Sequence, residues 1–197
     1  YVGVSVALSD AQLIGVSGFE LYASGTLKLN SASDGVTGLA LTPRMNWTLA
    51  TALANDPDGL LTDLDILAAV ALQVTGSAAI DIGNGALVAT VTGVELNLAT
   101  MDVTDGTTTL TGADILSFTG TASLFAGVGG SLNGAHTAVN NGTIGFAVNS
   151  VTLSLVSATG ALTDGANAGD SYVGVSVALS DAQLIGVSGF ELYASGT

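Results

Sequence analysis

The sequence predicts an all-β protein with an elongated repeat architecture. A β-solenoid is favoured, and tandem β-sandwiches are the alternative. Three observations carry this prediction. Apolar and polar residues alternate over long runs, Asn-Gly and Asp-Gly turn signals separate the runs, and the first 26 residues return unchanged later in the chain.

The internal repeat sets the predicted organisation. Residues 1–26, beginning YVGVSVAL, recur letter for letter as residues 172–197, so the period is 171 residues. Duplicated domains that had diverged would differ at scattered positions, and here there are no differences. We therefore expect residues 1–171 to be one full repeat unit and residues 172–197 to be the start of the next, in a window of a longer tandem array. The second copy would complete the preceding unit by continuous stacking or by strand addition.

Period-2 alternation predicts each strand in turn. The run at 19–30 is the longest and should have one buried and one wet face. Residues 60–74 fit both a helical stripe and a strand; we expect a strand from about Ile66 to Ile82, with a single helical turn near 60–65 left open. A change of parity between Val148 and Val151 predicts a bulge or corner. The other predicted strands are 2–8, 45–49, 94–98, 144–148 and 151–155.

A weak internal motif and the turn residues favour different architectures. A Val/Phe-Ser/Thr-Gly motif recurs with gaps of 20, 38, 17 and 27 residues between its glycines, and a coil of about 19 residues fits all but the last gap. Nine such coils, stacked about 4.8 Å apart, would give a period of about 43 Å. The Asn-Gly and Asp-Gly pairs are hairpin signals and favour the sandwich instead. The pairs stand at 34–35, 58–59, 84–85, 105–106, 133–134, 141–142 and 164–165.

Composition excludes several function classes. The chain has 16 acidic residues, 2 basic residues and no cysteine. This balance predicts no nucleic-acid binding and no adsorption to anionic membranes, and it favours the binding of cations. The sequence contains no long unbroken apolar run, so we expect no insertion into a membrane. Lys, Arg, His and Cys are nearly absent and no G-x-S-x-G motif occurs, so we expect no enzyme.

Three segments, SGFELYASGTLKLN, VTGSAAIDIGNG and VTGVELNLATMDVTDG, carry a family resemblance. Their Gly/Ser/Thr-rich, Val/Leu-alternating texture resembles giant repetitive bacterial extracellular and surface proteins, such as filamentous-haemagglutinin-like and other large adhesins. The resemblance covers most of the chain and implies export, β-rich rods, adhesion or matrix building, and often Ca²⁺. The glycine-rich nonapeptide of calcium-binding β-rolls is missing from the sequence.

An acidic stretch, NDPDGLLTDLD, is the candidate metal site. Carboxylates two residues apart beside a glycine can share a hard cation, so Asp56, Asp58, Asp63 and Asp65 are candidate Ca²⁺ ligands. The alternative is a solvated turn. Weaker candidates are Asp102, Asp105 and Asp114, and the pair Asp164 and Asp170.

Other candidate sites concern glycans. Sequons at Asn46 and Asn141 are candidate N-glycosylation sites. Tyr22, Lys28 and Trp47 could stack on a sugar, although an aromatic face on a sheet is more often packing. His136, the single histidine, is expected in an exposed loop.

The sequence thus predicts a non-catalytic structural repeat of an extracellular filament or surface fibre, whose partners are identical repeats of the same or neighbouring chains. The alternatives are the spacer or stalk of a large adhesin, or a glycan-binding β module. These functions place the protein outside the cell or on its surface.

Overall fold

The computed structural model describes residues 1–13, 16–188 and 192–197, apart from the side chain at position 10. Strands make up 60 % of the chain and helices 4 %, which confirms the all-β class. Among the helices described, none has the length and apolar character needed to cross a membrane.

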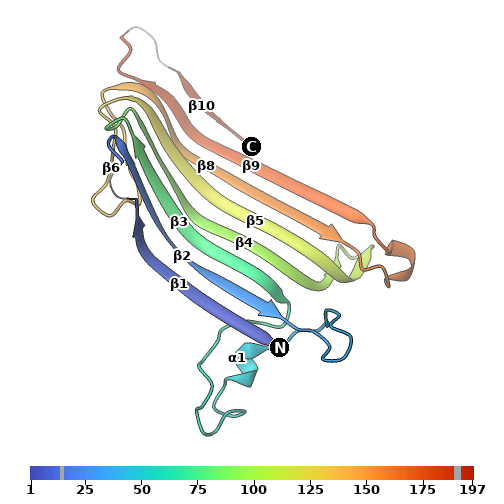
Figure 1. Ribbon diagram of the computed structural model, residues 1–197. Coiled ribbons are helices and arrows are strands. Elements are labelled where there is room, and N and C mark those ends of the chain that lie inside the picture. Colours follow the sequence, from blue (N-terminus) through green and yellow to red (C-terminus); the bar gives the residue numbers. More distant parts are fainter. Residues whose placement is uncertain (14–15, 189–191) are drawn as a thin grey trace.

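One antiparallel sheet contains all the long strands (Figure 1). Each strand pairs with the next long strand along the chain, in the order β1-β2-β3-β4-β5-β8-β9-β10. A small second sheet joins β6 and β7, and there is one short helix, α1, and one 3-10 turn, η1. The bounds are β1 Val2–Gln12, β2 Phe19–Ser31, α1 Trp47–Ala50, β3 Val70–Ile82, β4 Leu87–Thr104, β5 Thr109–Val128, β6 Ser131–Leu132, β7 Val139–Asn140, β8 Ile144–Thr159, η1 Gly165–Asn167, β9 Ser171–Ile185 and β10 Tyr193–Gly196.

The favoured β-solenoid is not confirmed, because its coils would stack as parallel rungs and the observed neighbours are all antiparallel. Tight hairpins cause this arrangement. Asn84 and Gly85 both adopt positive φ, 53° and 87°, so the chain reverses directly from β3 into β4. The tandem sandwich is not confirmed either, since the long strands of the described chain lie in one layer.

Most predicted strands are confirmed, and one is wrong. The runs at 2–8, 19–29 and 94–98 are strands, and the parity change after Val148 is a register shift in the β5–β8 pair. The expected strand at 45–49 is instead α1, because the Asn46 side chain accepts the backbone N–H of Leu49 at 3.1 Å and caps a helical turn. The strand expected from Ile66 begins at Val70, and residues 60–65 form no helical turn.

Alternation gives the sheet two chemically distinct faces, which the strand registers carry across all the long strands. On the apolar face, Val6 lies opposite Leu27, which lies opposite Val74, and the same row continues to Leu155 and Val175. On the polar face, hydroxyl and amide groups bond from strand to strand. These bonds include Ser24–Ser77, Gln73–Asn97, Asn97–Ser117, Thr119–Ser154 and Thr121–Thr152.

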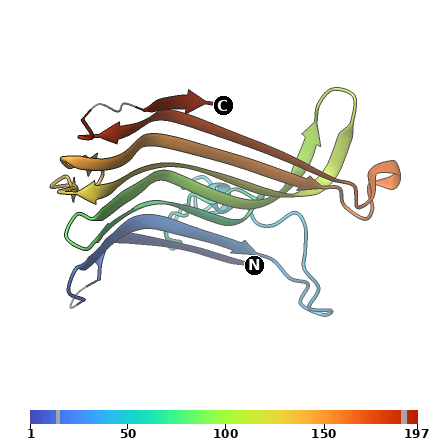
Figure 2. The same cartoon turned by 90° about the horizontal axis from the view of Figure 1, so that it is seen from above.

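The bulges line up across the sheet. Register shifts occur after Leu8 in β1, around Gly93 in β4 and after Val148 in β8. Gly93 has φ 58°, a backbone conformation that suits a bulge. Because each bulge turns its strand locally, aligned bulges bend the long strands together (Figure 2).

Most buried apolar residues lie on the polar side of the sheet, near the two ends of the strands, while Val148 and Ala182 are buried on the apolar side. Near one end Phe125 and Val88 are fully buried, close to the small β6–β7 sheet. At the other end the segment 32–69 covers β1 and β2 and buries Ile66. The apolar face, which alternation predicts to be buried, remains open within the part of the chain that the structure describes.

Candidate functional site

The two lateral edges of the large sheet carry strand pairs of the same sequence, β1–β2 and β9–β10. In β1–β2, Gln12 lies opposite Tyr22 and Leu8 lies opposite Gly25. In β9–β10, the residues 171 positions later make the same pairs, Gln183 with Tyr193 and Leu179 with Gly196. The repeated sequence therefore folds into the same register, including the same bulge, at both ends of one continuous sheet.

The outer edge of β1 is an unpaired edge in the described sheet. β1 pairs with β2 alone, whereas β9, which repeats its sequence, also pairs with β8 along its whole length, from Ser171 opposite Thr159 to Ile185 opposite Gly145. An unpaired edge exposes backbone N–H and C=O groups that can take another strand. The pairing of β9 with β8 thus shows that the sequence of β1 can pair with a strand of the β8 sequence.

The outer edge of β10 is the complementary case. Its counterpart β2 pairs with β3, from Phe19 opposite Ile82 to Leu29 opposite Leu72. Six long strands, β1 to β5 and β8, precede β9, so an antiparallel order returns β9 to the direction of β1. β10, which repeats part of β2, pairs antiparallel with β9 and therefore runs in the direction of β2, opposite to β1 at the other edge (Figure 1).

Covering segments distinguish the two copies. Trp47 packs over Gly3 in β1, and its Nε1 donates to Oδ1 of Asn30 at 3.0 Å. Asn30 is only 2 % exposed, and its Nδ2 donates to the carbonyl oxygens of Met45 and Leu67. Gly174, the repeat of Gly3, has no atom within 4 Å of where a Cβ would stand. Identical strands thus have different surroundings, because segment 32–69 covers only the first.

The candidate calcium ligands do not converge. Asp56 is buried and its Oδ2 accepts the Leu61 N–H at 2.7 Å, while Asp65 lies 3.1 Å from Nζ of Lys28. The hydrogen bond from Lys28 lowers the pKa of the Asp65 carboxyl, and the positive charge lowers it further. Asp56 and Asp63 line one cavity, and Asp58 is exposed. Within the described residues, no three acidic or histidine side chains group closely enough to hold a metal. Calcium binding stays a prediction.

Four of the weaker acidic candidates, Asp102, Asp105, Asp114 and Asp164, accept hydrogen bonds from the protein itself. Backbone N–H groups of Thr108 and Thr107 bond to Asp105 and lower the pKa of its carboxyl. Asp102 accepts the N–H of Gly112 at 2.7 Å. Asp114 accepts from the Thr100 hydroxyl, and Asp164 accepts from the N–H of Thr111. Such bonds fix turns and need no metal.

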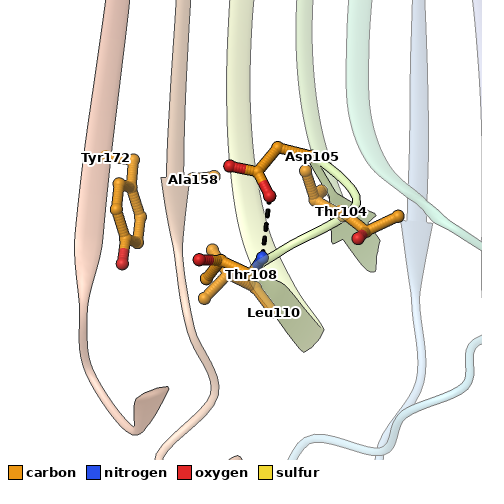
Figure 3. A pocket seen from close by; sticks show the side chains of 7 residues that line it. Thr104, Asp105, Thr108, Leu110, Ala158 and Tyr172 are labelled. Carbon is orange, nitrogen blue, oxygen red and sulfur yellow. Dashed lines mark hydrogen bonds between the residues drawn. The ribbon is translucent and has the colours of Figure 1, made fainter.

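A cavity of about 190 Å³ lies beside the Asp105 turn (Figure 3). Tyr172 of β9 and Ala158 of β8 flank it, together with Leu110 and Thr108. The Asp105 carboxylate points to the Thr108 amide of its own turn. The lining is mainly apolar, and Tyr172 in it opens the second copy of the repeated 26 residues.

The two sequons differ in accessibility. Asn46 is half-buried and its Oδ1 caps α1. Asn141 is exposed between β7 and β8, and its Nδ2 lies 3.4 Å from Oδ1 of Asn149. A glycan transfer enzyme needs an exposed, adaptable loop, so Asn141 is the better acceptor by geometry.

The aromatic candidates lie apart. Tyr22 stacks on His136, with ring centroids 3.5 Å apart, so His136 is half-buried rather than the exposed loop residue expected. Trp47 stands over the pair of Gly3 and Asn30, eight residues from Tyr22 along β2, or about 26 Å in an extended strand. Partial burial, together with the Glu20 carboxylate that accepts from its hydroxyl, raises the pKa of Tyr22. The rings form no common sugar-stacking surface.

Comparison with known proteins gives no relative: no protein-family model matches the chain, and neither a curated protein nor a solved structure matches it. The resemblance to large repetitive adhesins therefore stays a prediction that rests on the quoted segments. Sequence reasoning found the repeated edge but missed the Trp47–Asn30 contact. The signal for this contact was Trp47 directly after Asn46, a residue type that caps helices, but we assigned both residues to a strand.

Proposed function

We propose that the chain is a non-catalytic structural repeat unit of an extracellular filament or surface fibre, built as one antiparallel sheet that continues from unit to unit. The observation that carries this proposal is the repeated register. β9 pairs with β8 on one side and with β10 on the other, and β10 meets β9 as β2 meets β1. The next repeat thus begins inside the sheet of the previous one.

Continuation requires no new kind of contact. In an array, the strand that repeats β1 takes the β8 edge, and the strand that repeats β2 offers its far edge to a strand of the β3 sequence. Each junction is therefore the same ladder of backbone hydrogen bonds. Head-to-tail contacts of this type do not close on themselves, so they generate an open fibre.

The covering segments fit the same scheme. Gly174 is open where Gly3 is covered by Trp47. In an array the segment equivalent to 32–69 of a following unit would cover Gly174 and bury its surroundings. Each unit would thereby gain packing that a single copy lacks, which is how repeat proteins couple neighbouring units.

The acidic surface supports solubility outside the cell. The chain carries a net charge of −14, and Lys28, one of its two basic residues, pairs with Asp65. Charge of one sign favours solubility and attracts cations. Calcium at Asp56 and Asp63, and a glycan at Asn141, are accessory features of this proposal.

Fibre diffraction of a tandem array tests the proposal. Six strands per repeat, at about 4.8 Å each, give an axial repeat of about 29 Å. A solenoid of nine coils would give about 43 Å with the same 4.8 Å reflection. An axial repeat near 29 Å supports the continuous sheet. A repeat near 43 Å restores the solenoid, and separate beads without a 4.8 Å axial reflection refute both.

The second candidate is the spacer of a large adhesin, which the same fibre geometry favours if a binding tip lies elsewhere in the protein. The two uses differ in lateral assembly, because a spacer works as a single isolated fibre, whereas the fibres of a filament associate side by side. A glycan-binding module has less support, since Tyr22 is covered by His136 and Trp47 by its contacts with Gly3 and Asn30. Saturable sugar binding that Trp47→Ala abolishes would reinstate it.

A further inference from the structure

The apolar face of the large sheet is the most conspicuous surface that the proposed function leaves unused. Its paired residues run across every long strand, and Asp114, at the end of β5, alone among them carries a charge. The covering elements, segment 32–69 and the β6–β7 sheet, lie on the other face. The exposed members of this face include Val4, Val6, Leu8, Leu21, Leu27, Leu29, Leu116, Val173, Val175 and Val177.

We infer that this apolar face binds the same face of a second copy of the chain, so that two sheets stack with their aliphatic side chains between them. The inference goes beyond the proposed function, because a fibre of one sheet would also satisfy that function. Two sheets that pack face to face lie about 10 Å apart and bury the alternate residues of both.

The accessible area supports a partner of this size. The chain exposes 11568 Å², whereas a compact monomer of its 19.2 kDa mass exposes about 8,400 Å². The excess is about 3,100 Å². If each of two chains covered half of its excess, the contact would bury about 3,100 Å² in total, which lies in the range of obligate homodimers.

The repeat explains why the partner should be another copy. Val2, Val4, Val6 and Leu8 return on the same face as Val173, Val175, Val177 and Leu179, so the apolar surface has the period of the chain itself. A surface that repeats with this period is matched along its length by a surface of equal period. Charge points the same way, because two chains of net charge −14 repel each other least across this face, whose paired residues carry a single charge, that of Asp114.

A groove on this face adds shape to the contact. Gly25 and Gly76 lie opposite each other, and the apolar walls of Val6, Leu8 and Val94 enclose about 430 Å³ above them. Side chains that project from a facing sheet can fill such a groove. A groove of this kind is therefore expected at an interdigitated sheet contact.

The test measures association of the full 197-residue chain. Sedimentation equilibrium gives the mass up to ~100 μM, and solution X-ray scattering gives the shape. Stacking predicts a dimer with a thicker cross-section and nearly unchanged maximum length. End-to-end pairing of the sheet edges would lengthen the particle instead, so failure of stacking and failure of the proposed fibre are distinguishable.

A matched pair of variants identifies the face. Val177 on the apolar face is 48 % exposed, and Val156 on the polar face of the neighbouring strand is 49 % exposed. Val177→Lys should raise the dissociation constant of the stacked dimer at least roughly 100-fold, because it buries an unpaired charge. Val156→Lys should leave it unchanged. Lysine lowers the net negative charge, so general repulsion cannot explain a loss.

Three outcomes would overturn the inference. These are a parent chain that stays monomeric to ~100 μM, equal weakening by both variants, or a monomer that instead floats with vesicles of uncharged phosphatidylcholine. Circular dichroism checks that each variant is folded. If Val177→Lys is unfolded, Leu116→Lys in the middle of the same face replaces it, with the same expected result.

Discussion

The two copies of YVGVSV offer a stability comparison in which local sequence is held constant. Gly3→Ala and Gly174→Ala make the same change in the same strand context. A methyl group at Gly3 would lie 2.5 Å from Nε1 of Trp47, whereas one at Gly174 would meet nothing within 4 Å. We expect the first variant to be destabilised and the second to be slightly stabilised.

The structure sets the size of the difference. Forcing the indole away from Gly3 is an overpacking change of about 1–3 kcal/mol. It also breaks the 3.0 Å bond from Trp47 to Asn30, and an unsatisfied acceptor on a side chain that is 2 % exposed costs about 1–3 kcal/mol. Alanine itself gains about 0.5–1 kcal/mol over glycine in a strand. The Gly3→Ala variant should therefore lose about 2–4 kcal/mol, and Gly174→Ala should gain about 0.5–1 kcal/mol.

Two measurements check this result. The two variants differ by about 2.5–5 kcal/mol, so thermal unfolding followed by circular dichroism should separate them by about 7–15 °C in Tm for a chain of this size. Trp47 is the single tryptophan, so its fluorescence reports the contact directly. Emission should shift in Gly3→Ala and stay unchanged in Gly174→Ala. Equal stability of the two variants, with unchanged emission in both, would refute the packing of Trp47 over Gly3 and the covering role of segment 32–69.

Three further predictions concern the core, an acidic turn and pH. Phe125→Ala empties the site of the largest fully buried side chain in the described part of the chain, so the free energy of unfolding in urea should fall by about 3–5 kcal/mol, and Phe125→Leu should lose less than half of that. Asp56→Ala removes the acceptor of the Leu61 N–H and should lower Tm equally in calcium and in EDTA; a calcium-dependent rise in the Tm of the parent chain that Asp63→Asn abolishes would establish a calcium site instead. The pKa of Asp105 is lowered in the fold, so its contribution to stability is present above the unfolded pKa of about 3.9 and is lost as pH falls through the folded value. The urea midpoint should hold from about pH 7 to 5 and drop below about pH 4, less steeply in Asp105→Asn; a midpoint that rises on acidification would contradict this.

Local chemistry accounts for what sequence reasoning predicted well. The strand at 19–29 follows from alternation, and the bulge after Val148 follows from a change in that alternation. The hairpin at Asn84-Gly85 follows from two residues that accept positive φ. Each of these features depends on residues a few positions apart, which a sequence displays directly.

Contacts between distant residues account for the errors. Met45 to Leu49 alternate like a strand, but the Asn46 cap and the bond from Trp47 N–H to the Ile66 carbonyl favour a helical turn there. The four aspartates of the acidic stretch are close in sequence, yet Asp65 forms an ion pair with Lys28, which lies in a strand far away in sequence. No pattern within either segment reveals these partners.

By itself, the sequence determined that the protein is all-β, that its first 26 residues return 171 positions later, and which residues of each strand share a face. These properties are local or follow from counting along the chain. Only the tertiary structure decided that the strands form an antiparallel meander and that, among the described residues, Trp47 covers Gly3 while Gly174 and the apolar face stay uncovered. The physical reason is that alternation records a difference between two faces but not which face meets another layer, since that depends on where the long insertions fold back.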